Sequence, residues 1–372
     1  MAAFLKGLYQ RCVKDNSEEE NLVLLSVACI FLPFFVSAAV LLFVTVRAFF
    51  VKDIRSAIFS GLDIKFVAAF AILNVITPFV FKNWLGVACF AGFALMLVFA
   101  LYVRSVITER LFSKIGNVIA FMSLIPAFFS TFISDPRHDM RSPSFFFNPN
   151  YYGAVITFVI LLCAYRLLTE KQNRTLLIIA ITANLYGLWQ ADSQSAIFSI
   201  ALGILLLLLF TKRYKTFVVV VVLALLGAMA IIFVPQLDFL LPRISGAAQN
   251  ITKRATIWQA GIQGFLENFL FGRGLMGYLQ IHEKFGGAKN FHCHNLFIDL
   301  LLSFGIIGVA PLAAFVVRPI KKSFKSKYAP LTSAVLGAVL LHGLTDVTLI
   351  WIQTGALAAL FLSFPYIKEN SK

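Results

Sequence analysis

The stretch TFVVVVVLALLGAMAIIFV, residues 216–234, is followed at once by a polar segment that runs from Pro235 to about Phe291. The apolar stretch carries no charge and has about the 20 residues that a helix needs to cross a bilayer. The chain of 372 residues is 60% hydrophobic and 13% charged, with a mean hydropathy of +0.86. This composition is typical of a polytopic membrane protein and makes the large polar segment the exception.

Similar apolar runs recur along nearly the whole chain. Because helices satisfy their backbone hydrogen bonds internally in lipid, we expect each run to be a membrane-spanning helix. We predict one all-α membrane domain over residues 1–372, with about 11 or 12 transmembrane segments. The predicted spans are 22–46, 64–81, 84–103, 115–134, 151–168, 174–190, 194–210, 216–234, 295–317, 329–345 and 347–366.

Lysine and arginine crowd alternate loops. By the positive-inside rule these loops face the cytoplasm, and the intervening loops, including 135–150 and the large loop 235–293, face outward. The net charge of +15 therefore reflects topology, and we do not expect nucleic-acid binding. The cytoplasmic basic residues are Arg47, Lys52, Arg55, Lys65, Arg104, Arg110, Lys114, Arg166, Lys171, Arg174, Lys212, Arg213, Lys215, Arg318, Lys321, Lys322, Lys325 and Lys327.

The first span does not fit a strict alternation of cytoplasmic and outward loops. That alternation places the N-terminus outside, but the basic residues Lys6, Arg11 and Lys14 precede the first span. Pro33 lies midway through this span, where it would break the segment into two short helices that return to the same side. We prefer this arrangement, with both termini cytoplasmic. The start lacks the cleavage site of a secretory signal peptide, so the first segment should stay in the membrane.

Polar side chains gather at the outward ends of the spans, and cations dominate among them. Guanidinium groups are well shaped to hold phosphate oxygens in pairs, so the set favours an anionic ligand at the outer leaflet. The alternative for any single arginine is contact with lipid headgroups. The set comprises Arg137, His138, Arg141, Asn148, Asn150, Asp192, Ser193, Gln194, Arg243, Lys253, Arg254, His292, His294, Asn295, His342 and Asp346.

The large loop contains an amphipathic pattern at about residues 250–268. The apolar positions of this predicted helix would lie on the membrane surface or on the bundle. Arg254 lies one turn before Trp258, so a docked Trp258 would direct the guanidinium to a site under the loop. A solvated or lipid-facing Arg254 is the alternative. The apolar positions are Trp258, Ile262, Phe265 or Leu266, and Phe269.

Two motifs suggest sites that we reject. Residues 272–277, GRGLMG, match the dinucleotide fingerprint, but no strand precedes them, so we interpret the glycines as a tight connection. Cys293 lies between His292 and His294, and His282 is the remaining candidate ligand. A zinc site needs three or four ligands at workable spacing, so we predict no metal.

Several of these segments together resemble the signature of the O-antigen ligase and O-antigen polymerase superfamily. The order of the motifs and the large loop in the second half agree with that family, over roughly residues 145–350. The motifs are NPNYYG from Asn148, RATIW from Arg254, LFGRGL from Leu270, His294-Asn295 followed by FGIIG from Phe304, and LTD from Leu344.

The resemblance implies a GT-C-like membrane glycosyltransferase at the outer face of the bacterial cytoplasmic membrane. Its donor would be a glycan on a polyprenyl pyrophosphate, usually undecaprenyl, and its acceptor a hydroxyl of a glycan, a glycolipid or a protein. The reaction would need no metal or other cofactor, and the chain contains no Asp-x-Asp pair. The family pattern makes His294 the general base and Arg254 the pyrophosphate ligand, with His292 and Asn295 in support.

The chain departs from the family pattern at two positions. Gln194 stands where an arginine is expected at the start of the seventh span, and Phe269 stands where a proline is usual before the Leu-Phe-Gly run, a change we expect to affect only the loop. Either Arg243, Arg137 or Arg141 then takes the place of that arginine at the substrate, or the site serves a different donor. Asn150 and Asp346 complete the predicted substrate-binding set. His342 lies one turn before Asp346 and is expected either in a functional network or in a structural pair with it.

Two functions remain open beside glycan transfer by a ligase or by a polymerase. A lipid or polysaccharide transporter, or flippase, would also have many spans, but it should show paired broken helices or internal repeats. No such repeat is visible in the sequence. Peptidoglycan polymerases of the shape, elongation and division family share the donor type but match the motifs less well.

Overall fold

The computed structural model describes residues 16–234 and 247–367. Within these ranges the chain is helical, and its β-structure is limited to an isolated bridge between Asp135 and Arg141, which confirms the all-α class. The helices are α2 (Glu18–Cys29), α3 (Phe34–Phe50), α4 (Lys52–Ser60), α5 (Leu62–Val80), α6 (Trp84–Val106), α7 (Glu109–Met122), α8 (Leu124–Phe129), η1 (Pro136–His138), α9 (Pro149–Thr169), α10 (Arg174–Ala191), α11 (Gln194–Phe210), α12 (Tyr214–Phe233), α13 (Ala247–Glu267), α14 (Tyr278–Ile281), α15 (Leu296–Ser323), α16 (Ala329–Gly343), η3 (Thr348–Ile350), α17 (Ile352–Phe361) and η4 (Phe364–Tyr366).

The long apolar helices establish a polytopic membrane protein. In the described part, five stretches are long and apolar enough to cross a bilayer, namely α5, α6, the run Glu109–Phe129, α9 and α15. A sixth is formed if α3 and α4, which meet at 89°, count as one broken span. Shorter apolar helices include α11, α16 and the run Ile352–Tyr366. The total of about 11 or 12 spans stays a prediction.

The first predicted span is a helical hairpin, and Pro33 is the residue that begins its second helix. Arg47, near the end of α3, pairs with Glu18 at the start of α2 at 2.7 Å, so the two helices return the chain to the same side of the bundle. Gln353 Nε2 donates to Leu32 O at 2.7 Å and thereby ties the turn of the hairpin to α17.

Helix α4 was not anticipated from the sequence, which predicts only a basic loop after the first span. It is amphipathic, since Ile54 and Ile58 are buried while Lys52 and Arg55 are exposed. It turns away from α3 by 89°. A short helix of this type suits a position along the membrane interface, and it is too polar and too short to cross the bilayer.

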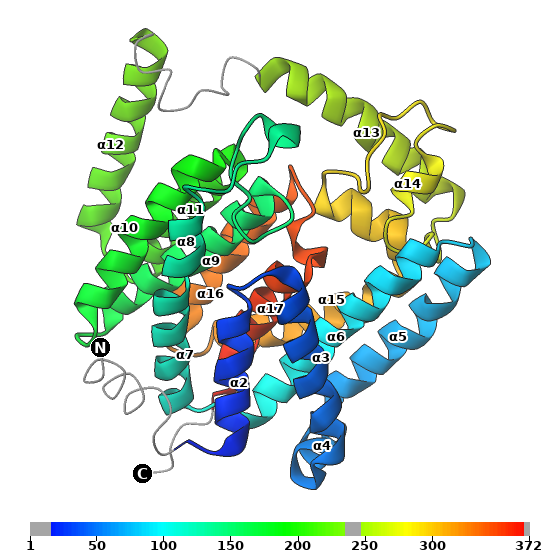
Figure 1. The fold of residues 1–372 in the computed structure, drawn as a ribbon, viewed down its shortest axis with the longest axis horizontal. Helices are drawn as coiled ribbons and strands as arrows, with labels where there is room; N and C mark the ends of the chain where they lie inside the picture. Colours follow the sequence, from blue (N-terminus) through cyan, green and yellow to red (C-terminus); the bar gives the residue numbers. More distant parts are fainter. Residues whose placement is uncertain (1–15, 235–246, 368–372) are drawn as a thin grey trace.

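Helix α9 lies at the centre of the bundle, where α10, α11 and α16 pack around it (Figure 1). Nearly all of its side chains are buried. Close packing depends on small residues, as is common between membrane helices. A Cβ atom at Gly153 would come within 2.8 Å of Ser193 and Ala196 on the α11 side. The N-terminus of α9 and the start of α11 therefore lie close together.

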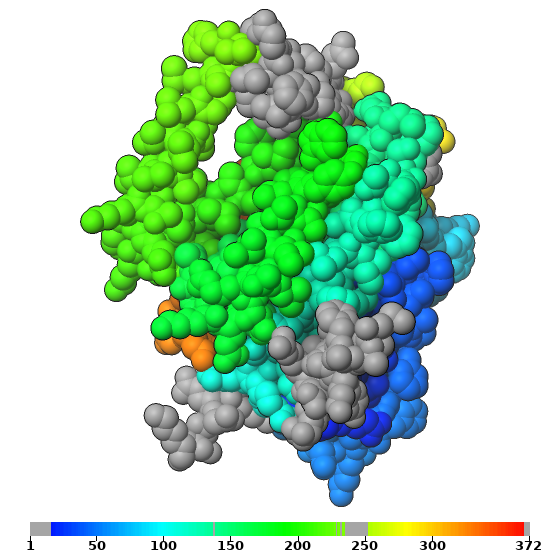
Figure 2. Space-filling model, turned by 60° about the vertical axis from the view of Figure 1, so that its left-hand side comes forward, coloured from blue at the N-terminus to red at the C-terminus, as the bar shows by residue number. Residues whose placement is uncertain are grey.

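Helix α12 occupies the edge of the molecule and makes its main contact with α11 (Figures 1 and 2). Its apolar side chains point outward, and Val218, Leu223 and Leu225 are each more than half exposed. A helix that is apolar all round and yet exposed is expected to face lipid. Residues 235–246, which follow α12, lie outside the described part of the chain.

Helix α15 is broken at Gly305, which has φ 61° and ψ −179°. The segment 269–274 of the large loop fills the break through backbone hydrogen bonds. A Cβ atom at Gly305 would come within 2.3 Å of Leu270 O, and one at Gly272 within 2.5 Å of the Ser303 carbonyl carbon. The glycines thus make a tight backbone connection. The bonds are Arg273 N to Leu302 O, Gly274 N to Ser303 O, Ile306 N to Phe269 O and Ile307 N to Leu270 O, at 2.8–3.0 Å.

Candidate active site

Two polar segments meet at one end of the bundle: the loop before α15, with His292 and His294, and the turn after α16, with Asp346. Asn295 joins them. Its Oδ1 accepts from the backbone N–H groups of residues 297 and 298, which caps α15, and its Nδ2 donates to Leu344 O at 3.1 Å. The cap therefore positions the neighbouring histidine against the aspartate.

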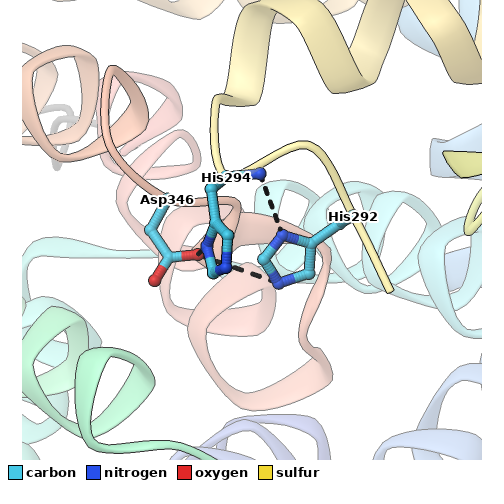
Figure 3. A group of neighbouring side chains, drawn as sticks. All are labelled: His292, His294 and Asp346. Atoms are coloured by element: carbon cyan, nitrogen blue, oxygen red, sulfur yellow. Dashed lines mark hydrogen bonds and ion pairs between the residues drawn. The ribbon is translucent and has the colours of Figure 1, made fainter. Parts of the chain in front are cut away.

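Two imidazoles converge on one carboxylate oxygen (Figure 3). His294 Nδ1 lies 3.2 Å from Asp346 Oδ1, and His292 Nε2 lies 3.8 Å from the same atom. The backbone N–H of His294 donates to His292 Nδ1 at 3.2 Å. These contacts join residues that are about fifty positions apart in the sequence into one cluster.

Asp346 is 1% exposed and has hydrogen-bond partners on both oxygens. Asn150 Nδ2 donates to Oδ2 at 2.6 Å, and the N–H of Val347 donates to Oδ1 at 2.8 Å. Burial acts to raise the pKa of Asp346, but His294, followed by His292 and His342, holds this pKa well below its usual range. The carboxylate is therefore ionised and held in one orientation.

His292 is a neutral support for the cluster. Burial, followed by the charges of His294 and Arg254, lowers the pKa of His292 to about 4, although Asp346 acts in the opposite direction. Its Nδ1 accepts a hydrogen bond, so the proton lies on Nε2, which faces the Tyr151 hydroxyl at 3.2 Å. This ring therefore holds the backbone of His294 in place.

His294 has one nitrogen facing the carboxylate and one facing outward. Because Nδ1 meets Asp346, that nitrogen carries the proton, and Nε2 is an acceptor that meets the Asn290 amide. The side chain is 21% exposed. The residue has φ +47°, a conformation that costs a non-glycine residue about 1–3 kcal/mol and that clusters at functional sites.

Helix α13 covers this loop, and it lies where the sequence predicts the amphipathic helix. Trp258 Nε1 donates to His294 O at 3.3 Å. The face of α13 in contact with the bundle differs in part from the predicted one. Ile257 and Gly261 are buried, whereas three of the predicted contact residues are exposed, namely Ile262, Leu266 and Phe269. Gly261 allows this approach, since a Cβ atom there would come within 2.7 Å of Cys293 Sγ.

Arg254 is half-buried on α13, and its positive charge lowers the pKa of His292, which places it near the histidines. Two other arginines of the predicted set cannot be compared with it. Arg243 lies outside the described residues, and so does the side chain of Arg137.

Arg141 enters the site from the other side. It is 9% exposed, and its Nη1 donates to Asn150 Oδ1 and to Asp192 O, both at 3.3 Å. Asn150 in turn contacts Asp346, so a polar chain leads from this arginine to the histidine pair. Gln194 begins α11 next to Asp192 and Ser193, and its buried Nε2 has no hydrogen-bond partner among the described residues.

The metal arrangement considered from sequence proximity does not form. Cys293 packs against α13, where burial raises the pKa of its thiol, and His282 Nδ1 contacts Leu279 O at 2.9 Å. In the described ranges, the His, Cys, Asp and Glu side chains close enough to share an ion are instead His292, His294 and Asp346, with ligand atoms within 4.8 Å of one another.

Three further residues refine the sequence interpretation. His342 contacts Asp346 through the backbone, since the Asp346 N–H donates to His342 O at 3.0 Å; its side chain is buried, and its Nε2 has no partner within residues 16–234 and 247–367. Tyr151 and Asn290 contact the two histidines but were not selected as site residues. Tyr151 belongs to the NPNYYG motif, which was a usable signal, whereas Asn290 has no sequence pattern that marks it.

Part of the chain matches a known protein family. Residues 179–313 match the O-antigen ligase family. The match confirms the resemblance to the O-antigen ligase and polymerase superfamily, and it includes Arg254, His294 and Asn295. No curated protein matches the chain.

The family match and the apolar helices together indicate a membrane enzyme of glycosyltransferase type, a multi-pass protein of the bacterial inner membrane. Lipid-linked glycans and their acceptors are the general partners of this O-antigen ligase family. Asn150 and Asp346 lie outside the matched segment, and the fold brings them to the histidines within it.

Proposed function

We propose that this O-antigen ligase-like protein transfers a glycan from a polyprenyl pyrophosphate, specifically undecaprenyl pyrophosphate, to an acceptor hydroxyl at the outer face of the cytoplasmic membrane. The observation that carries the proposal is the contact of His294 Nδ1 with ionised Asp346, which leaves Nε2 as an acceptor on the partly exposed side. This is the arrangement that a general base requires.

In the proposed reaction, the acceptor hydroxyl displaces the Asn290 amide from His294 Nε2, and this nitrogen takes the hydroxyl proton as the oxygen attacks the anomeric carbon of the donor. The bond from that carbon to the pyrophosphate oxygen breaks, and the electron pair leaves with the pyrophosphate. The imidazolium that forms is stabilised by Asp346, which also keeps the ring in one tautomer. The step requires no metal, because a base and a cationic clamp supply both functions.

Arg254 is our candidate for the clamp on the pyrophosphate. Its position beside the histidines would place the leaving group close to the base, and a guanidinium can bind two phosphate oxygens at once. Arg141 is our candidate for the role of the arginine that Gln194 replaces. It reaches the start of α11 through Asp192 O, and the unpartnered Gln194 Nε2 adds a neutral donor there.

The transporter alternative is less well supported. A secondary transporter typically has broken helices in corresponding positions of two repeats, with the breaks lining the substrate path. In the described part of the chain, α15 is the helix with non-helical dihedral angles inside it, at Gly305, and residues 269–274 fill that break. The break in α15 therefore anchors the large loop of the proposed enzyme and does not line a substrate path.

The test is transfer by the purified full chain on an undecaprenyl-pyrophosphate glycan in the presence of EDTA, with lipid-linked glycan, free glycolipid and protein acceptors supplied separately. We expect product with the wild type and with His282→Gln, and none with His294→Ala. The productive acceptor distinguishes a polymerase, which uses a second lipid-linked glycan, from a ligase. Specific donor binding without product from any acceptor would contradict the proposal and favour the transporter.

A further inference from the structure

The histidine cluster has a second chemical property beside its capacity to move a proton. His294 Nδ1 and His292 Nε2 both lie close to Asp346 Oδ1, at 3.2 and 3.8 Å, and the three ligand atoms lie within 4.8 Å of one another. His292 and Asp346 are buried, and His294 is the member open to solvent. One side of the cluster is therefore accessible to a small ion.

We propose that His292, His294 and Asp346 form an inhibitory site for Zn²⁺. Imidazole and carboxylate are ordinary zinc ligands, with bonds of about 2.0–2.2 Å, so that neighbouring ligand atoms of a tetrahedral site lie roughly 3.3–3.5 Å apart. The two separations from Asp346 Oδ1, at 3.2 and 3.8 Å, are close to these values, and the two ring nitrogens, which lie within 4.8 Å of each other, would move closer together on binding. The fourth position would be taken by water on the open side.

The ion would replace two existing hydrogen atoms. The proton of His294 moves from Nδ1 to Nε2, and the ion takes its place against Asp346 Oδ1. His292 must move its proton from Nε2 to Nδ1, which removes the hydrogen bond that Nδ1 accepts from the His294 N–H. The positive charge of Arg254 also opposes the ion. These costs favour reversible binding over permanent occupancy.

The inhibition follows from the tautomer of the bound ring and rests on the proposed function of His294 as a base. A neutral imidazole bound to zinc through Nδ1 carries its proton on Nε2. Nε2 is then a donor and cannot accept the proton of a hydroxyl. Zinc would also hold Asp346, which the imidazolium needs during the reaction. The site therefore competes with catalysis and does not assist it.

The test measures zinc binding and transfer on the same preparations of the full chain. Isothermal titration with ZnCl₂ and metal analysis after gel filtration would compare the wild type with Asp346→Asn and His292→Gln. The matched control is His282→Gln, because this histidine lies on α14 outside the cluster. Thermal unfolding without metal would establish that each variant is folded.

We expect one zinc ion per chain for the wild type and for the control, with at least tenfold weaker binding in both cluster variants. Zinc should also inhibit wild-type transfer, and EDTA should restore it. Equal zinc affinity in the wild type and the folded cluster variants, or no binding by the wild type, would overturn the site. Zinc binding by a protein that shows no transfer would instead support the site and contradict the proposed function.

Discussion

Two buried aspartates lie near opposite ends of α15, and their surroundings differ in kind. Asp346 lies near the start of this helix with two histidines, whereas Asp63 lies near its end with two arginines. Arg104 Nη1 meets Asp63 Oδ2 at 2.7 Å, and Arg318 Nη1 meets Oδ1 at 3.0 Å. Both aspartates join helices that are distant in the sequence.

The partners decide what each cluster can do. Arg104 is stacked over Phe315 at 4.3 Å and over Tyr366 at 4.7 Å, and its guanidinium stays charged at any accessible pH. The Asp63 cluster, which the Tyr366 hydroxyl joins by donating to Asp63 Oδ2 at 2.7 Å, therefore holds α5, α6 and α15 together. A neutral imidazole can accept a proton and pass it on, so the Asp346 cluster is suited to chemistry. The comparison yields five predictions.

The largest effect is expected for His294→Ala, which removes the proposed base. Transfer should fall by about 10²- to 10⁴-fold, the usual contribution of a general base. The measurement is the initial rate of glycan transfer at saturating donor, with the thermal unfolding midpoint as the check on folding. A rate within a factor of two of the wild type would remove His294 from the mechanism.

The second largest effect is expected for Asp346→Asn, because this substitution keeps the shape of the side chain but removes the negative charge beside His294. A hydrogen bond to a charged group contributes about 1.5–3 kcal/mol, and each 1.36 kcal/mol in the barrier is tenfold in rate. We expect a loss of kcat of about 10²-fold with a smaller change in KM. A change in KM alone would show that Asp346 binds substrate and does not support the base.

Arg254→Lys should lower transfer by roughly tenfold, because lysine keeps the charge but loses the paired donors of the guanidinium. The measurement is kcat/KM for the lipid-linked donor. Lys253→Gln is the matched control, since Lys253 is an exposed neighbour on the same helix. Unchanged turnover by Arg254→Lys would show that positive charge alone is sufficient at that position.

Arg104→Gln tests whether the Asp63 cluster contributes to stability and not to transfer. Removal of one partner from a buried ion pair costs about 3–5 kcal/mol of stability, so the unfolding midpoint in detergent should fall clearly. Transfer per folded molecule should change by less than twofold. Arg318→Gln, at a half-exposed position, should have a smaller effect on stability. A selective loss of transfer with normal stability would indicate a catalytic connection between the two clusters.

The smallest effect is expected from chelation. Because the proposed mechanism uses a base and an arginine clamp, EDTA should not lower the transfer rate. Removal of trace zinc should raise the transfer rate slightly. The measurement is transfer after dialysis against EDTA, with and without added Mg²⁺. Loss of activity on chelation that Mg²⁺ restores would overturn the metal-independent mechanism.

Much of the fold was accessible from the sequence, because lipid imposes a simple rule on it. Apolar runs must become helices, and Pro33 within the first run marks the turn between α2 and α3. The motif around His294 and Asn295 also indicated the kind of enzyme, and the family match over residues 179–313 agrees with it.

Only the tertiary structure decided which polar groups act together. The sequence left open whether Asp346 joins a functional network or pairs only with His342, one turn away. Helix α16 ends between the two residues, and the turn keeps them in contact while it directs the carboxylate to His294. Arg141 likewise reaches Asn150 through a loop that has no periodic pattern. Side-chain contacts between distant segments depend on helix ends and packing, which local sequence does not encode. The sequence by itself determined a helical membrane protein with a histidine motif, and the packing of α9, α15 and α16 determined its proposed active site.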